Sequence, residues 1–210
     1  EHNSKVYAGK DEKGAPIRYF EETSKKGPRS RYAQYKLRAE GVVDEAMQCS
    51  LHSGSSSRRD SAAESRINAA ILRFSHIYPD TDLHSKPSGY LPQLVHNAIR
   101  GLPLPVAGTN RRIDLLHVSD GVDAILRAIS YLESNPGIGC EKRVFNIGRG
   151  KSTKMRDLVR AILNDTHSLS KILVLPNPGN LLLDDVNLNT ERSRQLLGFI
   201  PKVSNFKFPF

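Results

Sequence analysis

The chain has 210 residues, of which 38% are hydrophobic and 25% charged, with a formal net charge of +9 at neutral pH. This length suits one domain, or one domain with a lobe, and the composition is that of a globular protein. The longest apolar runs are a few residues, whereas a membrane-spanning helix needs about 20, so the sequence predicts none. Lysines and arginines are scattered and do not alternate with aromatic residues, which disfavours nucleic-acid binding.

The N-terminal sequence has no basic segment leading into an apolar stretch, so no signal peptide is predicted. The first residue is Glu1 rather than methionine, and we expect the chain to begin partway through a longer protein. Cys49 and Cys140 have no metal-binding or redox spacing and indicate a reducing compartment. The seven histidines include no His-x-x-x-His pair, so no metal site is predicted. These features together predict a cytoplasmic protein.

Strands and helices are predicted to alternate along the chain. Val6 and Tyr7 end a first strand, and a polar loop leads to a helix whose apolar residues have helical spacing: Tyr35, Ala39, Val42, Val43, Ala46 and Met47. Residues 49–66 are rich in Ser and Arg and have little to bury, which predicts a mobile insertion. Residues 67–74 predict a buried parallel strand, followed by a loop to residue 89 and a helix over residues 90–100.

The second half continues the alternation. Residues 114–118 predict a strand, and the helix after it is expected to begin at Asp120 as N-cap and to bury Val122, Ile125, Leu126 and Ile129. Later elements are predicted at residues 143–147 (strand), 155–163 (helix), 172–175 (strand) and 190–197 (helix ended by Gly198). This order indicates an α/β fold with a mainly parallel sheet.

Tyr32 and Lys36 stand four residues apart at the start of the first predicted helix, which places a phenol and an ammonium one turn apart on one face. A nearby cation favours the phenolate, so such a tyrosine can take a proton from an alcohol while a hydride leaves the adjacent carbon. The same spacing also arises by chance on surface helices, so an ordinary Tyr/Lys pair is the alternative interpretation.

Two phosphate-binding patterns are incomplete. The turn at residues 148–152 follows a predicted strand and precedes a helix, but the Walker pattern needs a glycine where this chain has Phe145. No Gly-x-Gly-x-x-Gly occurs, so the pyrophosphate cradle of a dinucleotide-binding fold is missing from these residues. The sequence therefore does not predict an NTPase.

Several stretches, in order, carry a family resemblance. Residues 5–9 (Lys-Val-Tyr-Ala-Gly) are similar to Ser-x-x-Val-Tyr-Gly, residues 21–24 to an acidic loop, and residues 30–40 to Pro-Tyr-x-x-Ser-Lys-x-x-x-Glu. Residues 72–79 resemble Leu-Arg-x-x-Asn-Val-Tyr-Gly-Pro, residues 112–120 Arg-Asp-Phe-x-His-Val-x-Asp, residues 144–150 Phe-Asn-Ile-Gly-x-Gly, and residues 189–201 the closing Leu-Gly-Phe-x-Pro segment. Together they resemble the extended short-chain dehydrogenase/reductase family, the NAD-dependent nucleotide-sugar epimerases and dehydratases.

The resemblance implies a fold and a set of roles. Residues 1–210 would be the C-terminal part of the family fold, a partial Rossmann-like parallel sheet with a small C-terminal substrate-binding lobe. Tyr32 would be the general acid/base, and Lys36 would hold the nicotinamide ribose and favour the phenolate. The remaining implied site residues are Phe74 and Ser75 at the nicotinamide, and His76 and Arg112 at the nucleotide sugar. NAD would be the cofactor, with NADP as the open alternative.

This chain departs from the family pattern at several positions. The family's hydroxyl partner of the tyrosine corresponds to Asn3, with Ser4 one place away, and an amide cannot join a hydroxyl proton relay. Arg112 is one residue further from His117 than the family arginine. Pro79 replaces a glycine, and the family's N-terminal half, with its glycine turn, is not in these residues.

The sequence therefore predicts an NAD-dependent epimerase or dehydratase that works by transient oxidation of a sugar hydroxyl. As this chain alone we expect little NAD affinity, no turnover, and an exposed sheet edge and apolar face. A non-catalytic binding or scaffold descendant of the same fold is the alternative. A nucleotide sugar is the expected partner, without nucleic acid or membrane, and a homodimer is compatible with the family resemblance.

Overall fold

The computed structural model describes residues 7, 20–28, 30–52, 67–79, 87, 89–109, 111–136, 138–176 and 187–203. The helices among them are α1 (Arg31–His52), α2 (Tyr90–Ile99), α3 (Val118–Ser134), α4 (Met155–Asp165) and α5 (Glu191–Leu197), with a 3₁₀ turn at Cys140–Arg143. The strands are β1 (Ile71–Phe74), β2 (His76–Tyr78), β3 (Leu104–Ala107), β4 (Arg112–His117), β5 (Val144–Ile147), β6 (Ser152–Lys154) and β7 (Ile172–Leu175).

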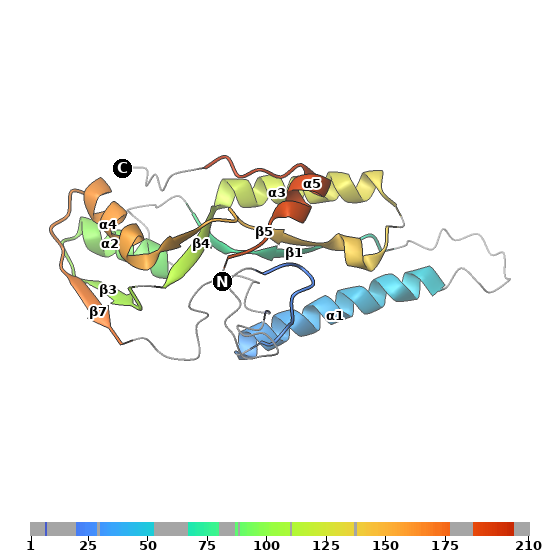
Figure 1. Cartoon of the computed structure of the whole chain (residues 1–210), viewed down its shortest axis with the longest axis horizontal. Coiled ribbons are helices and arrows are strands. Elements are labelled where there is room, and N and C mark those ends of the chain that lie inside the picture. Colours follow the sequence, from blue (N-terminus) through green and yellow to red (C-terminus); the bar gives the residue numbers. More distant parts are fainter. Residues whose placement is uncertain are drawn as a thin grey trace.

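A parallel pair of strands forms the centre of the first part of the molecule. β1 pairs with β5, with Arg73 opposite Asn146. Figure 1 shows α3 on one side of this pair and α1 on the other. On the α3 side, Phe145 and Ile147 of β5 join Ala124 of α3 in an apolar cluster that α5 also enters. This arrangement is the α/β architecture with parallel strands that the sequence predicts.

A smaller lobe holds the remaining sheets. β4 lies between β2, which is parallel to it, and β6, which is antiparallel, while β3 and β7 form a second parallel pair. α2 and α4 cover this lobe (Figure 1), and their apolar residues pack with those of β3 and β4 into its core. Because β2 follows β1 after one residue and β4 runs directly into α3, the lobe is joined to the first part at these strand ends.

The buried side of α3 differs from the prediction. Val122, Ile125, Leu126 and Ile129 are all exposed, Leu126 to 59%. The residues that face the sheet are small, with Gly121, Ala124 and Ala128 buried. Small side chains let the helix approach the strands closely, so its large apolar residues are turned outward. The predicted stripe was wrong because apolar residues occupy more than half of the circumference of this helix.

The N-cap of α3 also differs from the prediction. His117 is the N-cap, and its Nδ1 accepts a hydrogen bond of 3.3 Å from the Ser119 backbone N–H. Asp120 instead lies in the first turn and is buried, where its carboxylate accepts the backbone N–H groups of Lys202 (3.0 Å) and Val203 (3.1 Å). Asp120 therefore ties the chain after α5 to the start of α3.

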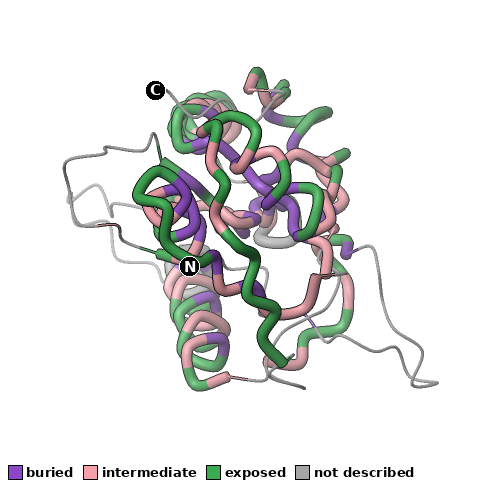
Figure 2. Tube along the Cα trace, turned by 90° about the vertical axis from the view of Figure 1, so that its left-hand side faces the viewer, coloured by how far each residue is buried: buried purple, intermediate pink, exposed green. Residues whose placement is uncertain are grey.

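The buried face of the long helix α1 also differs from the prediction. Of its predicted apolar stripe, Met47 is buried, whereas Tyr35 (64%) and Val42 are exposed. The buried line runs through Ala33 and Glu40. In Figure 2 the buried residues lie between the elements and the exposed ones follow their outer turns.

Several element boundaries are longer or shorter than predicted. The strand predicted over residues 67–74 is limited to β1, and α1 continues to His52, into the first residues of the predicted insertion. Residues 53–66 lie outside the described part of the chain. Three short strands, β2, β3 and β6, were not predicted, because runs of three or four residues lack a recognisable alternation.

Candidate functional site

The candidate acid/base pair lies in the first two turns of α1. Ser30 caps this helix, because its hydroxyl accepts the Ala33 backbone N–H at 3.1 Å and its carbonyl accepts that of Gln34 at 3.0 Å. Tyr32 and Lys36 are both half-buried. The Lys36 Nζ lies 5.4 Å from the centroid of the Tyr32 ring, within the range of a cation–π contact. The four-residue spacing therefore does bring the ammonium and the phenol ring together.

The residues that would border a nicotinamide lie where β1 ends. Phe74 is the last residue of β1, and the buried Ser75 donates its backbone N–H to the Ile147 carbonyl at 2.7 Å. Beyond Ile147 the chain enters the Gly148 turn. A Cβ at Gly148 would lie 2.7 Å from Asp114 Oδ2 and 3.0 Å from Ser75 Oγ. Only glycine fits here without a shift of its neighbours, so three segments meet at this point.

Asp114 is a buried carboxylate beneath that turn. It accepts the backbone N–H groups of Arg149 (3.0 Å) and Gly150 (3.1 Å). Burial raises the pKa of Asp114 to about 6, although these two hydrogen bonds and the Arg149 charge favour the ionised form. Asp114 thus holds the glycine turn against β4 and titrates near neutral pH.

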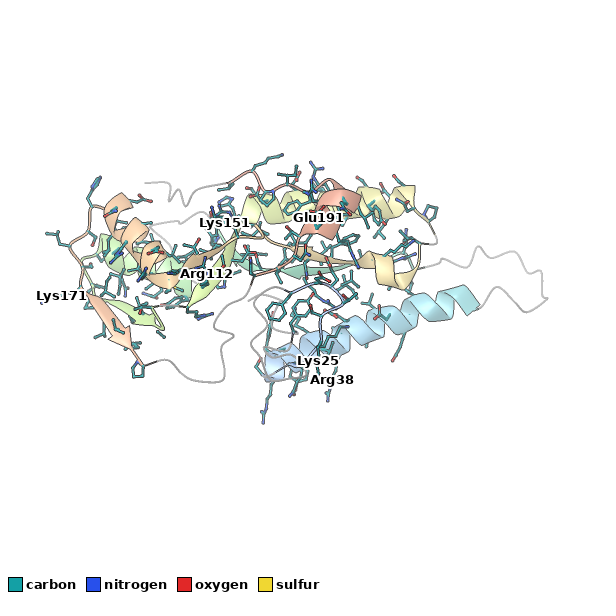
Figure 3. All side chains as sticks on the ribbon, viewed as in Figure 1. Lys25, Arg38, Arg112, Lys151, Lys171 and Glu191 are labelled. Atoms are coloured by element: carbon teal, nitrogen blue, oxygen red, sulfur yellow. The ribbon has the colours of Figure 1, made fainter. Side chains whose placement is uncertain are left out.

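The two candidate substrate residues lie in the smaller lobe. His76 begins β2 and pairs with Leu115 of β4. Arg112 begins β4, and its guanidinium donates to Ser152 of β6, from Nε to the hydroxyl at 2.9 Å and from Nη2 to the carbonyl at 3.0 Å. Figure 3 shows Arg112 on β4 and Lys151 on the turn before β6. Opposite Arg112 in the antiparallel pair stands Lys154, so this end of the lobe is cationic.

The displacement of Arg112 has a structural consequence. Counted from His117, the family arginine would correspond to Ile113, whose side chain is buried in the core with α2 and α4. Neighbouring residues of a strand point to opposite faces. Arg112 therefore lies on the same face of β4 as Asp114, away from that core.

The predicted site residues thus come from α1, the end of β1, β2 and β4. Asn3 and Ser4 lie outside the described residues, so the predicted loss of the hydroxyl partner stays a prediction. Sequence analysis missed Asp114 and the buried ion pair between Arg73 and Glu40. A charged residue inside an apolar strand was the available signal in both strands, as in Ile113–Leu116 and Ile71–Phe74.

The described residues fit one end of a dinucleotide. A half-buried tyrosine with a lysine over its ring is chemically compatible with a ribose, and Ser75 is buried at the end of β1. The pyrophosphate end has no glycine cradle in this sequence. A groove of about 500 Å³ between α3 and α5, lined by Asp123, Leu126, Arg127 and Leu196 among others, contains none of the predicted site residues.

Comparison with solved structures finds the same fold in two nucleotide-sugar enzymes and in a third protein. UDP-glucose 4-epimerase from Thermotoga maritima, with UDP-glucose, superimposes with a TM-score of 0.73 at 20% identity, over 96% of this chain and 57% of that one. The dTDP-glucose 4,6-dehydratase DesIV from Streptomyces venezuelae, with NAD and TYD bound, gives 0.71 at 20% identity, over 96% and 53%. RMD from Pseudomonas aeruginosa, complexed with NADPH, gives 0.68 at 20% identity, over 95% and 59%.

This chain therefore spans a little over half the length of the solved structures that it matches. At 20% identity these likenesses show the fold. No curated protein matches the sequence. A family model matches from residue 3 to residue 148, which is more than half of the chain. The chain belongs to the NAD dependent epimerase/dehydratase family.

Proposed function

We propose that this chain is the C-terminal part of an NAD-dependent nucleotide-sugar epimerase or dehydratase, and that residues 1–210 are completed by a glycine-containing N-terminal half. The observation that carries the proposal is the contact of Lys36 with the Tyr32 ring on a capped helix, within the region that matches the family model. In the complete protein the reaction would be a transient oxidation of a sugar hydroxyl.

The two residues of the pair have different tasks. Tyr32 takes the proton of the sugar hydroxyl and returns it later, as a general acid/base. Lys36 binds the ribose hydroxyls, and its ammonium lies over the Tyr32 ring. Phe74 and Ser75 hold the nicotinamide face in place. NAD, when bound, supplies the hydride acceptor; NADP is the alternative, because related structures contain NAD or NADPH.

The substrate would lie between the pair and the small lobe. His76 contacts the sugar, and Arg112 binds the diphosphate, since a guanidinium can donate two parallel hydrogen bonds to phosphate oxygens. The cationic end of β4 and β6, with Lys154 opposite Arg112, supports an anionic ligand. The bound UDP-glucose and TYD of the related structures support a nucleotide-linked sugar as the class of substrate.

Cofactor binding by the complete protein tests this proposal. Lys36→Ala should weaken NAD binding at least tenfold in calorimetry, because the ribose loses a charged hydrogen-bond donor. Lys171→Ala removes a lysine beside β7, far from the pair in sequence and in the other lobe, and should leave affinity unchanged. NAD binding that is equally tight in the wild type and in Lys36→Ala would refute the cofactor role.

A non-catalytic binding or scaffold protein is the second candidate. Two departures favour it, Asn3 in place of the hydroxyl partner and the displaced Arg112. This candidate predicts nucleotide-sugar binding in the complete protein without turnover. Product analysis with UDP-glucose and with dTDP-glucose separates it from the enzyme, since an active epimerase or dehydratase changes either the sugar configuration or its mass.

The setting of the protein follows from weaker signals. We propose a cytoplasmic location, because the spacing of the two cysteines fits no metal-binding or redox motif and indicates a reducing compartment. Among the described residues, no helix is long and apolar enough to cross a membrane. We also propose a homodimer, supported by the exposed apolar residues of α1. Nucleic-acid binding is disfavoured, and failure to retain the protein on immobilised DNA at low salt would be the expected result.

A further inference from the structure

The contact between α1 and the central strands is made by a buried ion pair. Arg73 of β1 is only 1% exposed. Its Nε donates to Glu40 Oε1 at 2.9 Å and its Nη2 to Glu40 Oε2 at 2.8 Å. Such a bidentate pair fixes both the separation and the relative orientation of the two side chains.

The rest of the guanidinium is also engaged. Its Nη1 donates to the Tyr7 hydroxyl at 2.8 Å and to the Glu22 carbonyl at 2.9 Å. The Tyr7 hydroxyl in turn donates to Asn146 Oδ1 at 2.7 Å, and Asn146 stands opposite Arg73 in the sheet. Arg73 is therefore the centre of a network that joins α1, β1, β5 and the segment before α1.

Arg73 stays protonated at physiological pH. Burial opposes the charge of Arg73, but the hydrogen bonds and charge of Glu40 outweigh it and hold the pKa of Arg73 above its ordinary value. Lys26 adds a second cation 3.5 Å from Glu40 Oε2.

Glu40 lies on the same side of α1 as the candidate acid/base pair. Tyr32, Lys36 and Glu40 follow one another at four-residue intervals, which keeps them on one side of a helix. At the other end of the contact, Arg73 precedes Ser75 by two residues, so both point to the same face of the sheet. The Arg73–Glu40 ion pair thus links the helix that carries Tyr32 to the strand end that would border the nicotinamide.

Apolar packing alone would position α1 poorly. Its described apolar anchors are Ala33, the partly buried Leu37 beside Tyr7, and Met47 near its end. Apolar contacts tolerate sliding and rotation, whereas two parallel hydrogen bonds between charged groups do not.

We propose that Arg73 and Glu40 are positioning residues, which set the axial position and rotation of α1 and thereby place Tyr32 and Lys36 against the end of β1. The chemical roles of Tyr32 and Lys36 rest on the proposed function; the placement of α1 by the ion pair does not. Neither Arg73 nor Glu40 contacts a reacting group.

The decisive variant replaces both partners with an apolar pair, Glu40→Met with Arg73→Met. Replacing a buried ion pair by apolar residues often preserves stability, whereas removing one partner does not. We expect the double variant to melt near the wild-type temperature, but with altered amide shifts over residues 31–37. If the double variant does not fold, Arg73→Lys replaces it in the test. This variant keeps the positive charge but loses the two parallel hydrogen bonds of the guanidinium, and it should show the same altered shifts.

A matched control is available at the far end of α1. Arg143 is also buried and holds the Ile138 carbonyl (2.6 Å), Asn68 Oδ1 (2.8 Å) and Met47 Sδ (3.6 Å). Arg143→Lys should lower the melting temperature while leaving the shifts of residues 31–37 unchanged. Unchanged shifts in the double Met variant, or equal shifts in Arg143→Lys, would overturn the proposal.

The complete protein provides a second readout. If it turns over a nucleotide sugar, the double Met variant should lose about 100-fold in kcat, the scale of an ångström of misplacement, with KM within about twofold. A rise in KM as large as the fall in kcat would contradict a positioning role. If the wild type shows no turnover, the proposed function fails, whereas the spectral test of α1 placement still decides this inference.

Discussion

Asp114 shows at the residue scale how burial and hydrogen bonding compete. The carboxylate is almost fully buried, and two backbone N–H groups stabilise its charge, yet burial prevails and raises the pKa of Asp114 to about 6. Its ordinary value is 3.8, so the folded protein binds more protons than the unfolded chain between these values. The stability that Asp114 contributes is therefore present below about pH 4 and lost as the pH rises through about 6.

This linkage predicts a measurable difference between the wild type and Asp114→Asn. The difference in their free energies of unfolding should change by about 2.4 kcal/mol between pH 4 and pH 7.5, at about 1.4 kcal/mol for each unit of pKa shift. Urea denaturation at a series of pH values measures it. A difference that stays constant with pH would show that Asp114 titrates normally.

Gly148 is a second residue with a specific steric role. A Cβ there would lie 2.7 Å from Asp114 Oδ2, so Gly148→Ala should destabilise the protein by about 1–3 kcal/mol, the usual cost of overpacking. Gly41 is the matched control, because it lies inside α1 and a Cβ there would meet no atom of another element within 4 Å. Gly41→Ala should stabilise by about 0.5–1 kcal/mol, since alanine favours helix. Chemical denaturation of both variants tests the pair, and equal effects would contradict the steric argument.

At the element scale, α1 and α3 each leave large apolar residues exposed, but in different settings. The outward residues of α1 include Tyr35 and Val42, on the side opposite the line that meets the sheet. Those of α3 include Leu126, which lines the groove beside α5 together with Leu196. The exposed surface of α3 therefore adjoins another helix of the fold.

We propose that the exposed apolar side of α1 contacts a second copy of the chain. Val42→Lys places a charge at the centre of its exposed stripe and should convert a dimer to a monomer, because burying the charge would cost more than the contact gains. Sedimentation analysis measures the change. Arg38→Lys, an exposed position on the same helix that keeps its charge, should leave the dimer intact, and a monomeric wild type would contradict the interface.

At the scale of the whole molecule, the chain is shorter than the structures that it matches and leaves apolar surface exposed. The chain spans 57% of the Thermotoga maritima epimerase with a TM-score of 0.73. β1 leaves Leu72 and Phe74 only partly buried, and α3 leaves Val122, Ile125, Leu126 and Ile129 exposed. We propose that the remaining βα units of the family fold cover this surface in the complete protein.

If further units of the fold cover this apolar surface, the complete protein should behave differently in solution from this chain alone. This chain alone should bind an apolar fluorescent dye and self-associate, and Ile125→Lys with Leu126→Lys should reduce both effects without lowering the melting temperature, because both side chains are exposed. The complete protein should bind little dye. Strong dye binding by the complete protein would contradict the proposed cover.

Local sequence was sufficient to identify the family and the order of the longer elements. Ordered motifs around Tyr32 and Lys36 identify the family independently of packing, and the spacing of these two residues is local, so helix geometry alone brings them together. The chain positions of α2, α4, α5 and β7 were predictable from local patterns. Residue roles at the site remain predictions, and those of Asn3 and Ser4 concern residues outside the described part.

The buried faces and the contacts between distant groups could be learned only from the folded chain. α3 is apolar around most of its circumference, so its pattern could not show that Gly121, Ala124 and Ala128 face the strands. The contact of Arg73 with Glu40 spans 33 residues, and that of Asp114 with Gly150 spans 36. Such contacts depend on how the strands are ordered in space, and no local periodicity carries that information.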